Sequence, residues 1–99
     1  MGLNLALDEL RATGWSDLDS TGCAYDRDGR AYPGVSRVRQ EFAAAGFDLR
    51  IERVDQYSCF RASWRDAASS TDAGAVVGFT EPEAAVYALS HLRRTLAAV

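Results

Sequence analysis

The stretch from Gly74 to Leu96 constrains the fold of this 99-residue chain more than any other part of its sequence. An apolar run over residues 75–79 leads through Thr80-Glu81-Pro82-Glu83 into a long segment with leucines at helical spacing. A threonine three residues before a glutamate is typical of a capping box, in which each side chain accepts a hydrogen bond from the other residue's backbone N–H. Proline in the first helical turn costs no hydrogen bond. The sequence therefore predicts a strand over 74–79 that leads directly into a helix over 81–97.

Apolar side chains in this strand and helix are expected to cover a core. In the helix, four residues recur at the spacing of one helical face: Ala85, Leu89, Leu92 and Leu96. In the strand, successive side chains point to opposite faces of the sheet. We assign three residues to the inward face and leave Val76 on the outward face: Ala75, Val77 and Phe79.

Two more strands are predicted before this one, because apolar and polar residues alternate over 47–52 and again over 59–65. The inward residues are Phe47, Leu49 and Ile51 in the first strand, and Phe60, Ala62 and Trp64 in the second. The connection through Asp55-Gln56 is short, so the two strands are expected to be antiparallel.

Helices are predicted over 3–13 and 35–45, and each is followed by a glycine that can end it, Gly14 or Gly46. Between the helices, Asp28-Gly29 predicts a small hairpin over residues 23–32 with a type I′ turn. Residues 16–22 read as a polar loop.

These elements predict a single domain over residues 1–99 with an α+β fold. We expect a two-layer sandwich in which an antiparallel meander of three or more strands is covered on one face by helices 35–45 and 81–97. The N-terminal helix is expected to close an edge of the sheet.

Composition and charge narrow the classes of function. The net charge is −3, so the overall field gives no attraction to the phosphates of DNA or RNA. Residues 1–33 hold six acidic residues against three arginines, which concentrates the negative charge near the N-terminus. No apolar stretch approaches the roughly 20 residues that cross a bilayer, and the first residues lack the basic start of a secretory signal. We therefore expect a cytoplasmic monomer or homodimer without a membrane partner.

From residue 35 onward, the expected order is helix, strand, strand, strand, helix. This order, with the Ala-rich helix that follows Thr80, resembles double-stranded-RNA-binding domains, and the pattern is also similar to small α/β sandwich proteins of phage and bacterial genomes. The RNA-binding family holds phosphate through a basic cluster at the start of its last helix, where Glu81 and Glu83 stand here. Because acidic side chains repel phosphate, the resemblance implies the fold of that family without its RNA binding.

The outward side chains of the first two strands form the first candidate binding surface. Arg50 and Glu52 on one strand are expected near Arg61, Ser63 and Arg65 on the other. Arginines arranged in this way can hold an acidic protein surface or phosphate through paired hydrogen bonds. The same residues also fit a solvated face crossed by Arg–Glu pairs worth about 0.2–1 kcal/mol each. Arginines 61 and 65 without carboxylate partners would indicate a binding role.

A second candidate comprises Trp15, Tyr25 and Tyr32, which lie among the N-terminal acidic residues. Exposed aromatic side chains beside carboxylates suit a protein interface, and the local negative charge would steer a basic partner toward it. The alternative is that these three aromatic residues belong to the core.

Residues for catalysis or metal binding are few. Cys23 and Cys59 are thirty-six residues apart without a CxxC motif, and we interpret them as buried, inert thiols. His91 is the single histidine and is predicted to face solvent. We therefore predict a non-enzymatic module that binds another protein and uses no cofactor or metal. The alternatives are nucleic-acid binding through the three arginines of the sheet face and a thiol-dependent enzyme built on Cys59 and His91.

Overall fold

The computed structural model describes residues 2–16, 18 and 21–97. Its described part contains three helices and two antiparallel sheets, which confirms the predicted α+β class. The helices are α1 (Gly2–Ala12), α2 (Val35–Ala44) and α3 (Glu81–Ala97), and the strands are β1 (Cys23–Tyr25), β2 (Ala31–Pro33), β3 (Phe47–Val54), β4 (Cys59–Asp66) and β5 (Asp72–Gly78). A short 3-10 turn, η1 (Asp55–Tyr57), joins β3 to β4.

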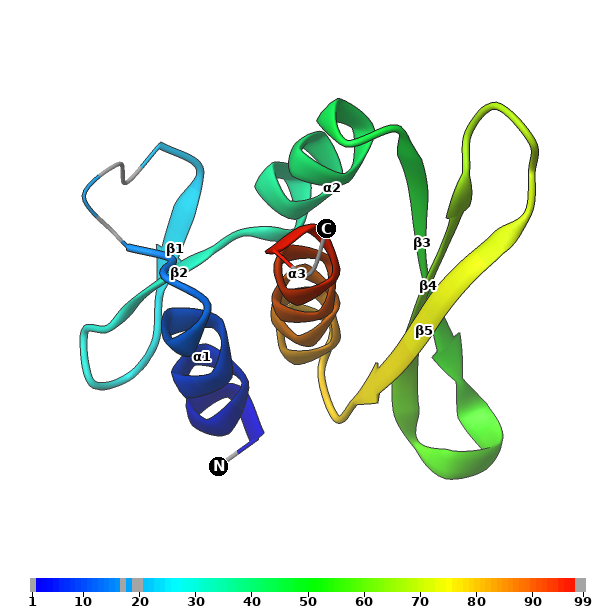
Figure 1. Cartoon of the computed structure of the whole chain (residues 1–99). Coiled ribbons are helices and arrows are strands. Elements are labelled where there is room, and N and C mark those ends of the chain that lie inside the picture. Colours follow the sequence, from blue (N-terminus) through cyan, green and yellow to red (C-terminus); the bar gives the residue numbers. More distant parts are fainter. Residues whose placement is uncertain (1, 17, 19–20, 98–99) are drawn as a thin grey trace.

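The larger sheet has the strand order β3-β4-β5 and carries α2 and α3 on one face, while no described element covers its other face (Figure 1). α1 and the β1–β2 hairpin lie on the far side of α3 (Figure 1). The prediction that the N-terminal helix closes an edge of the sheet is therefore wrong, because α1 packs against α3. This position leaves the outer face of the sheet open.

α3 lies at the centre of the core, between α1 and the sheet (Figure 1). Its buried apolar residues are Ala84, Ala85, Val86, Ala88, Leu89 and Leu92. Leu7 and Leu10 of α1 and Phe42 of α2 are fully buried in the same cluster. Leu96, which was predicted to be a core residue, is 51% exposed. That prediction is wrong because the last turn of α3, residues 94–97, is exposed on all sides.

The start of α3 confirms half of the predicted capping box. Thr80 Oγ1 accepts a hydrogen bond of 3.2 Å from the Glu83 N–H. The buried Glu83 carboxylate accepts one of 2.8 Å from the Phe79 N–H rather than from the predicted Thr80 N–H. The two side chains therefore satisfy backbone donors on both sides of the helix start, with the second bond shifted by one residue.

β5 has the opposite facing from the one predicted. Val76 packs against the core, whereas Ala75 is exposed and Val77 and Phe79 are 59% and 76% exposed. Directly opposite residues of neighbouring strands share a face of the sheet. Val76 is the partner of the buried Ala62, so it must face inward.

Two glycines explain why the alternation of apolar residues was misleading in β5. Gly74 and Gly78 alternate with Val76 and therefore share its inward face. A Cβ on Gly74 would lie 2.4 Å from the Trp64 ring, and one on Gly78 would lie 2.7 Å from the backbone nitrogen of Ala84. The inward positions of β5 are small because neighbouring groups fill that space.

The predicted hairpin forms between β1 and β2, but its turn is not type I′. The Gly29 N–H donates to the Asp26 carbonyl at 3.1 Å, so the turn runs over residues 26–29. A type I′ turn centred on Asp28 and Gly29 requires a positive φ at both residues. Gly29 has a φ of 78°, but Asp28 has no positive φ. The Asp26 carboxylate accepts hydrogen bonds from the N–H groups of Asp28 and Arg30 at 2.9 and 2.8 Å, and these bonds stabilise this turn.

The ends of α1 and α2 lie within one residue of the helix ends predicted from the sequence. α1 and α2 end shortly before Gly14 and Gly46, whose φ angles are 95° and 90°. The predicted polar loop includes Asp17, Asp19 and Ser20, which lie outside the described residues.

Candidate protein-binding face

Alternation along β3 and β4 brings all five predicted residues of the first candidate to one surface. Arg50 lies opposite Ser63, and Glu52 lies opposite Arg61. Arg65 follows Ser63 on the same face, two residues along β4. We call this surface the outer sheet face and define it by Asp48, Arg50 and Glu52 of β3, Arg61, Ser63 and Arg65 of β4, and Asp72, Ala75 and Val77 of β5.

The arginines of the outer sheet face differ in their partners. The Arg50 guanidinium lies 3.3 Å from the Glu52 carboxylate, and both side chains are more than half exposed. By contrast, Arg61 and Arg65 make no hydrogen bond or ion pair with any described residue. These two unpaired guanidinium groups meet the criterion that favours a binding surface over a network of surface ion pairs.

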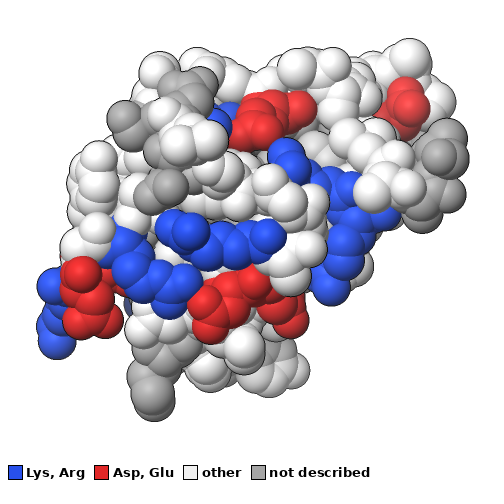
Figure 2. Space-filling view, turned by 60° about the vertical axis from the view of Figure 1, so that its left-hand side comes forward, with Lys and Arg blue, Asp and Glu red and all other residues white. Residues whose placement is uncertain are grey.

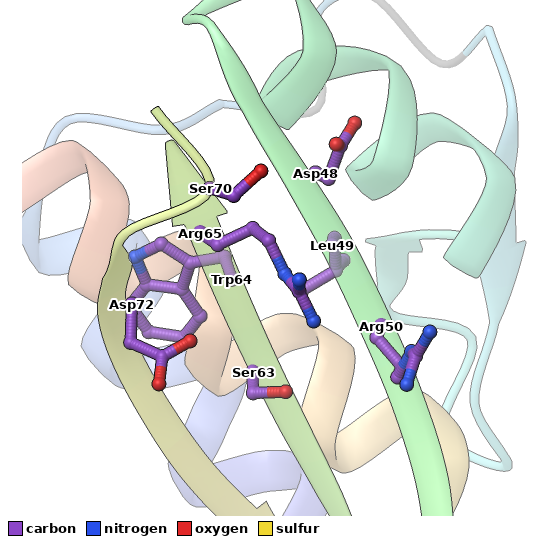
Figure 3. A pocket seen from close by; sticks show the side chains of 8 residues that line it. All are labelled: Asp48, Leu49, Arg50, Ser63, Trp64, Arg65, Ser70 and Asp72. Carbon is purple, nitrogen blue, oxygen red and sulfur yellow. The ribbon is translucent and has the colours of Figure 1, made fainter. Parts of the chain in front are cut away.

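Carboxylates lie near Arg65 without pairing with it (Figure 3). Asp48 is its partner on β3 and Asp72 its partner on β5, across a bulge. In Figure 3 the Arg65 side chain extends from β4 toward β3, while the Asp48 carboxylate points away from its guanidinium. The Arg65 charge is therefore free to meet a group from another molecule.

Two adjoining depressions run along the outer sheet face, with volumes of about 440 and 330 Å³. They share Arg50, Ser63, Arg65 and Asp72 as lining residues. The smaller one extends over Gly74, which has no side chain, and over Ala75 of β5, whose methyl group is too small to fill it. The depressions thus form one continuous groove, which is lined by arginines of β3 and β4 and by the small residues Gly74 and Ala75 on the β5 side.

An apolar surface adjoins this groove and was not found from the sequence. Val77 and Phe79 are exposed and line a separate cavity of about 280 Å³ together with Cys59, Glu83 and Tyr87. The sequence analysis did not find this surface because it assigned Val77 and Phe79 to the inward face of the strand. The glycines that alternate with Val76 are the signal that could have revealed the correct facing.

Two groups near opposite ends of β4 have shifted pKa values. The backbone N–H groups of Ser69 and Ala68 lower the pKa of the Asp66 carboxyl from its ordinary value of 3.8. Burial raises the pKa of the Tyr87 hydroxyl, and the carboxylates of Glu83 and Glu9 raise it further. The first shift favours the ionised carboxylate of Asp66, and the second favours the neutral hydroxyl of Tyr87.

The aromatic residues of the second candidate are not brought together at the surface. Trp15 is 6% exposed, and the guanidinium groups of Arg11 and Arg37 lie 5.9 and 5.8 Å from the centre of its ring. Tyr32 packs against the core, and only Tyr25, at 62%, is largely exposed. Trp15 therefore belongs to the core, as the alternative interpretation predicts, and Tyr32 belongs to it in part.

The N-terminal side of the molecule is also less uniformly acidic than its sequence suggests. Figure 2 shows groups of basic and acidic side chains next to one another on this side. Arg30 and Asp8 form an ion pair at 2.7 Å, with the Asp8 side chain 63% exposed. Asp17 and Asp19 lie outside the described residues.

The cysteines are less buried than predicted. Both are free and partly buried, and the Cys23 sulfur lies 3.2 Å from an Arg37 Nη1 donor. His91 is exposed, as predicted, and its ring centre lies 6.0 Å from that of Trp64. Cys59 lines the apolar cavity but His91 does not. Within the described ranges, no three His, Cys, Asp or Glu residues are grouped to hold a metal ion.

Comparisons of the chain with protein-family models, curated proteins and solved structures give no match. A search of the described residues finds no helix with the length and apolar character of a membrane span. Inference about function therefore depends on the chemistry of the surfaces.

Proposed function

We propose that this chain is a non-enzymatic module that binds another protein through its outer sheet face. The observation that carries the proposal is the pair of unpartnered, exposed guanidinium groups of Arg61 and Arg65 on a sheet face that no described element covers. Arginine is favoured at protein interfaces because it offers several donors to carboxylates and carbonyls.

The exposed apolar residues beside the arginines support the same function. Protein interfaces combine an apolar centre with polar groups around it. Val77 and Phe79 supply apolar area next to the groove, and the arginines supply directional hydrogen bonds. Such a surface suits a partner that is partly apolar and partly acidic.

Nucleic-acid binding, the alternative, has weaker support on this face. The charged residues of the outer sheet face are three arginines and three carboxylates, namely Arg50, Arg61 and Arg65 with Asp48, Glu52 and Asp72. The carboxylates offset the attraction to phosphates, and the chain as a whole has a charge of −3.

The proposal predicts the outcome of an affinity capture from lysate of the source cells. The Arg61→Glu/Arg65→Glu double variant is expected to retain about ten-fold less of the captured protein than wild type, since reversing both charges removes two interface contacts and adds repulsion. Arg39→Glu, an exposed site on α2, is the matched control and should capture as wild type does. Thermal unfolding followed by circular dichroism verifies that the variants are folded.

Nuclease treatment of half of each sample separates the two kinds of partner. Capture that survives nuclease and depends on Arg61 and Arg65 supports the proposal. The proposal fails if the double variant captures the same proteins as wild type, or if nuclease releases all of them.

A further inference from the structure

The pairing of β3 with β4 leaves one arginine of the outer sheet face without a carboxylate opposite it. Ser63 stands opposite Arg50, and its side chain carries no charge. At the other two arginine positions the opposite residue on β3 is acidic. The three opposed pairs are Asp48 with Arg65, Arg50 with Ser63, and Glu52 with Arg61.

Three arginines surround Ser63. Arg61 and Arg65 lie two residues before and after it on β4, so their Cα atoms are each about 7 Å from its Cα. Arg50 is its direct neighbour on β3. All four residues line the depression of about 330 Å³. In Figure 3 the Arg65 side chain and the Ser63 hydroxyl both point from β4 toward β3, on which Arg50 lies. The three guanidinium groups can therefore contact one group bound above Ser63.

Most of the donors around this position are unused within the chain. Arg61 and Arg65 have no partner among the described residues, and neither does the Ser63 hydroxyl. Arg50 pairs only with Glu52, in an exposed contact that is weak and easily exchanged. Two unpaired guanidinium groups leave two positive charges, and a single carboxylate balances one of them. A phosphoryl group balances both, because it carries a charge of about −1.5 to −2 and three acceptor oxygens.

We propose that these four residues, which we call the Ser63 site (Arg50, Arg61, Ser63 and Arg65), bind a phosphoryl group on a Ser, Thr or Tyr side chain of the protein partner. This inference deepens the proposed function and rests on it. Arginine forms two parallel hydrogen bonds with phosphate oxygens, and a serine hydroxyl can donate one more. Clusters of arginines are a general means of recognising phosphorylated segments.

The apolar surface beside the site favours a phosphoryl group that belongs to a protein. Val77 of β5 lies opposite Arg61, and Val77 and Phe79 are both largely exposed. Apolar side chains next to a phosphorylated residue in the partner would contact this surface, whereas free phosphate would not.

The carboxylates around the site limit it to one phosphoryl group. Asp48 and Asp72 flank Arg65 on the two neighbouring strands, and Glu52 lies opposite Arg61. The successive phosphates of a nucleic acid would meet these carboxylates on either side of the site. A single phosphorylated side chain meets only the arginines and the hydroxyl above Ser63.

A synthetic phosphopeptide tests this inference directly. The probe is a fluorescein-labelled nine-residue peptide of glycines and threonines with leucine at positions 3 and 7 and phosphoserine at position 5, and the readout is fluorescence anisotropy. We expect it to bind at least about ten-fold more tightly than the same peptide with serine or glutamate at position 5. Equal binding of the glutamate peptide, or no binding of the phosphopeptide up to about 1 mM, overturns the inference.

Removal of the two unpaired charges tests the location of the site. The Arg61→Gln/Arg65→Gln variant is expected to bind the phosphopeptide at least about ten-fold more weakly than wild type. Arg27→Gln/Arg39→Gln changes the net charge equally at exposed positions on other surfaces and should bind as wild type does. Circular dichroism verifies that both variants are folded. Equal weakening by the two double variants would show that only net charge matters, and the inference would fail.

Phosphatase treatment of the source lysate tests whether the phosphoryl group comes from a protein. We expect active protein phosphatase to abolish the capture that depends on Arg61 and Arg65, and heat-inactivated phosphatase to leave it unchanged. If the phosphopeptide binds but lysate gives no capture sensitive to phosphatase, the group comes from another source and the inference is wrong.

These outcomes are distinct from failure of the proposed function. Capture that depends on Arg61 and Arg65 and survives both phosphatase and nuclease overturns the phosphoryl inference and leaves protein binding in place. Capture that does not depend on the two arginines contradicts the proposed function itself.

Discussion

Replacement of Trp64 by alanine is expected to lower the free energy of unfolding by about 3–5 kcal/mol. Trp64 is 6% exposed on the inner face of β4, and its ring centre lies 5.2 Å from that of Phe42. The ring also fills the space above Gly74, so its removal leaves a cavity between the sheet and the helices. Urea unfolding measures the change. It is followed by far-ultraviolet circular dichroism rather than by tryptophan fluorescence, because the variant lacks Trp64.

Phe79→Ala is the matched control for this prediction. Phe79 is 76% exposed at the end of β5, so its truncation should change stability by no more than about 0.5 kcal/mol. A near-neutral Trp64→Ala together with a strongly destabilising Phe79→Ala would show that the facing of the sheet is inverted.

Leu7→Ala is expected to cost about 2–5 kcal/mol, because Leu7 is fully buried in the core cluster that α1 shares with α3. Its neighbour Leu5 on the same helix is 56% exposed, and Leu5→Ala should change stability by no more than about 0.5 kcal/mol. The same unfolding experiment compares the two variants.

This pair of leucines tests whether α1 is an integral layer. If Leu7→Ala is as mild as Leu5→Ala, α1 does not pack against α3 as described. A large difference would also explain why the outer sheet face stays open, since α1 is then held on the opposite side of α3 (Figure 1).

The helices and the first two large strands could be predicted from sequence because strong local signals define them. Leucine spacing, the Thr80 cap and the glycines after α1 and α2 are local features, and they mark the helix limits within one or two residues. The alternation in β3 and β4 likewise placed Arg50, Glu52, Arg61, Ser63 and Arg65 on one face, as the register shows.

The remaining features depend on contacts between distant residues. The facing of β5 is determined by pairing with β4, where Ala62 is the partner of Val76, and no periodicity within β5 records that. The position of α1 depends on the packing of α3, which contacts α1 on one side and the larger sheet on the other. The missing partners of Arg61 are likewise a matter of geometry, because Glu52 lies opposite Arg61 in the register but pairs with Arg50.

Site-specific photo-crosslinking tests the central claim, that the outer sheet face binds a protein, most directly. A photoreactive residue is placed at Ala75 on the outer sheet face and, as a matched control, at Ala43, an exposed alanine on α2 against the opposite face of the sheet. We expect nuclease-resistant protein adducts in source lysate from position 75 and none from position 43. Adducts from position 43 alone, or equal adducts from both positions, would contradict the assignment of the outer sheet face as the binding surface.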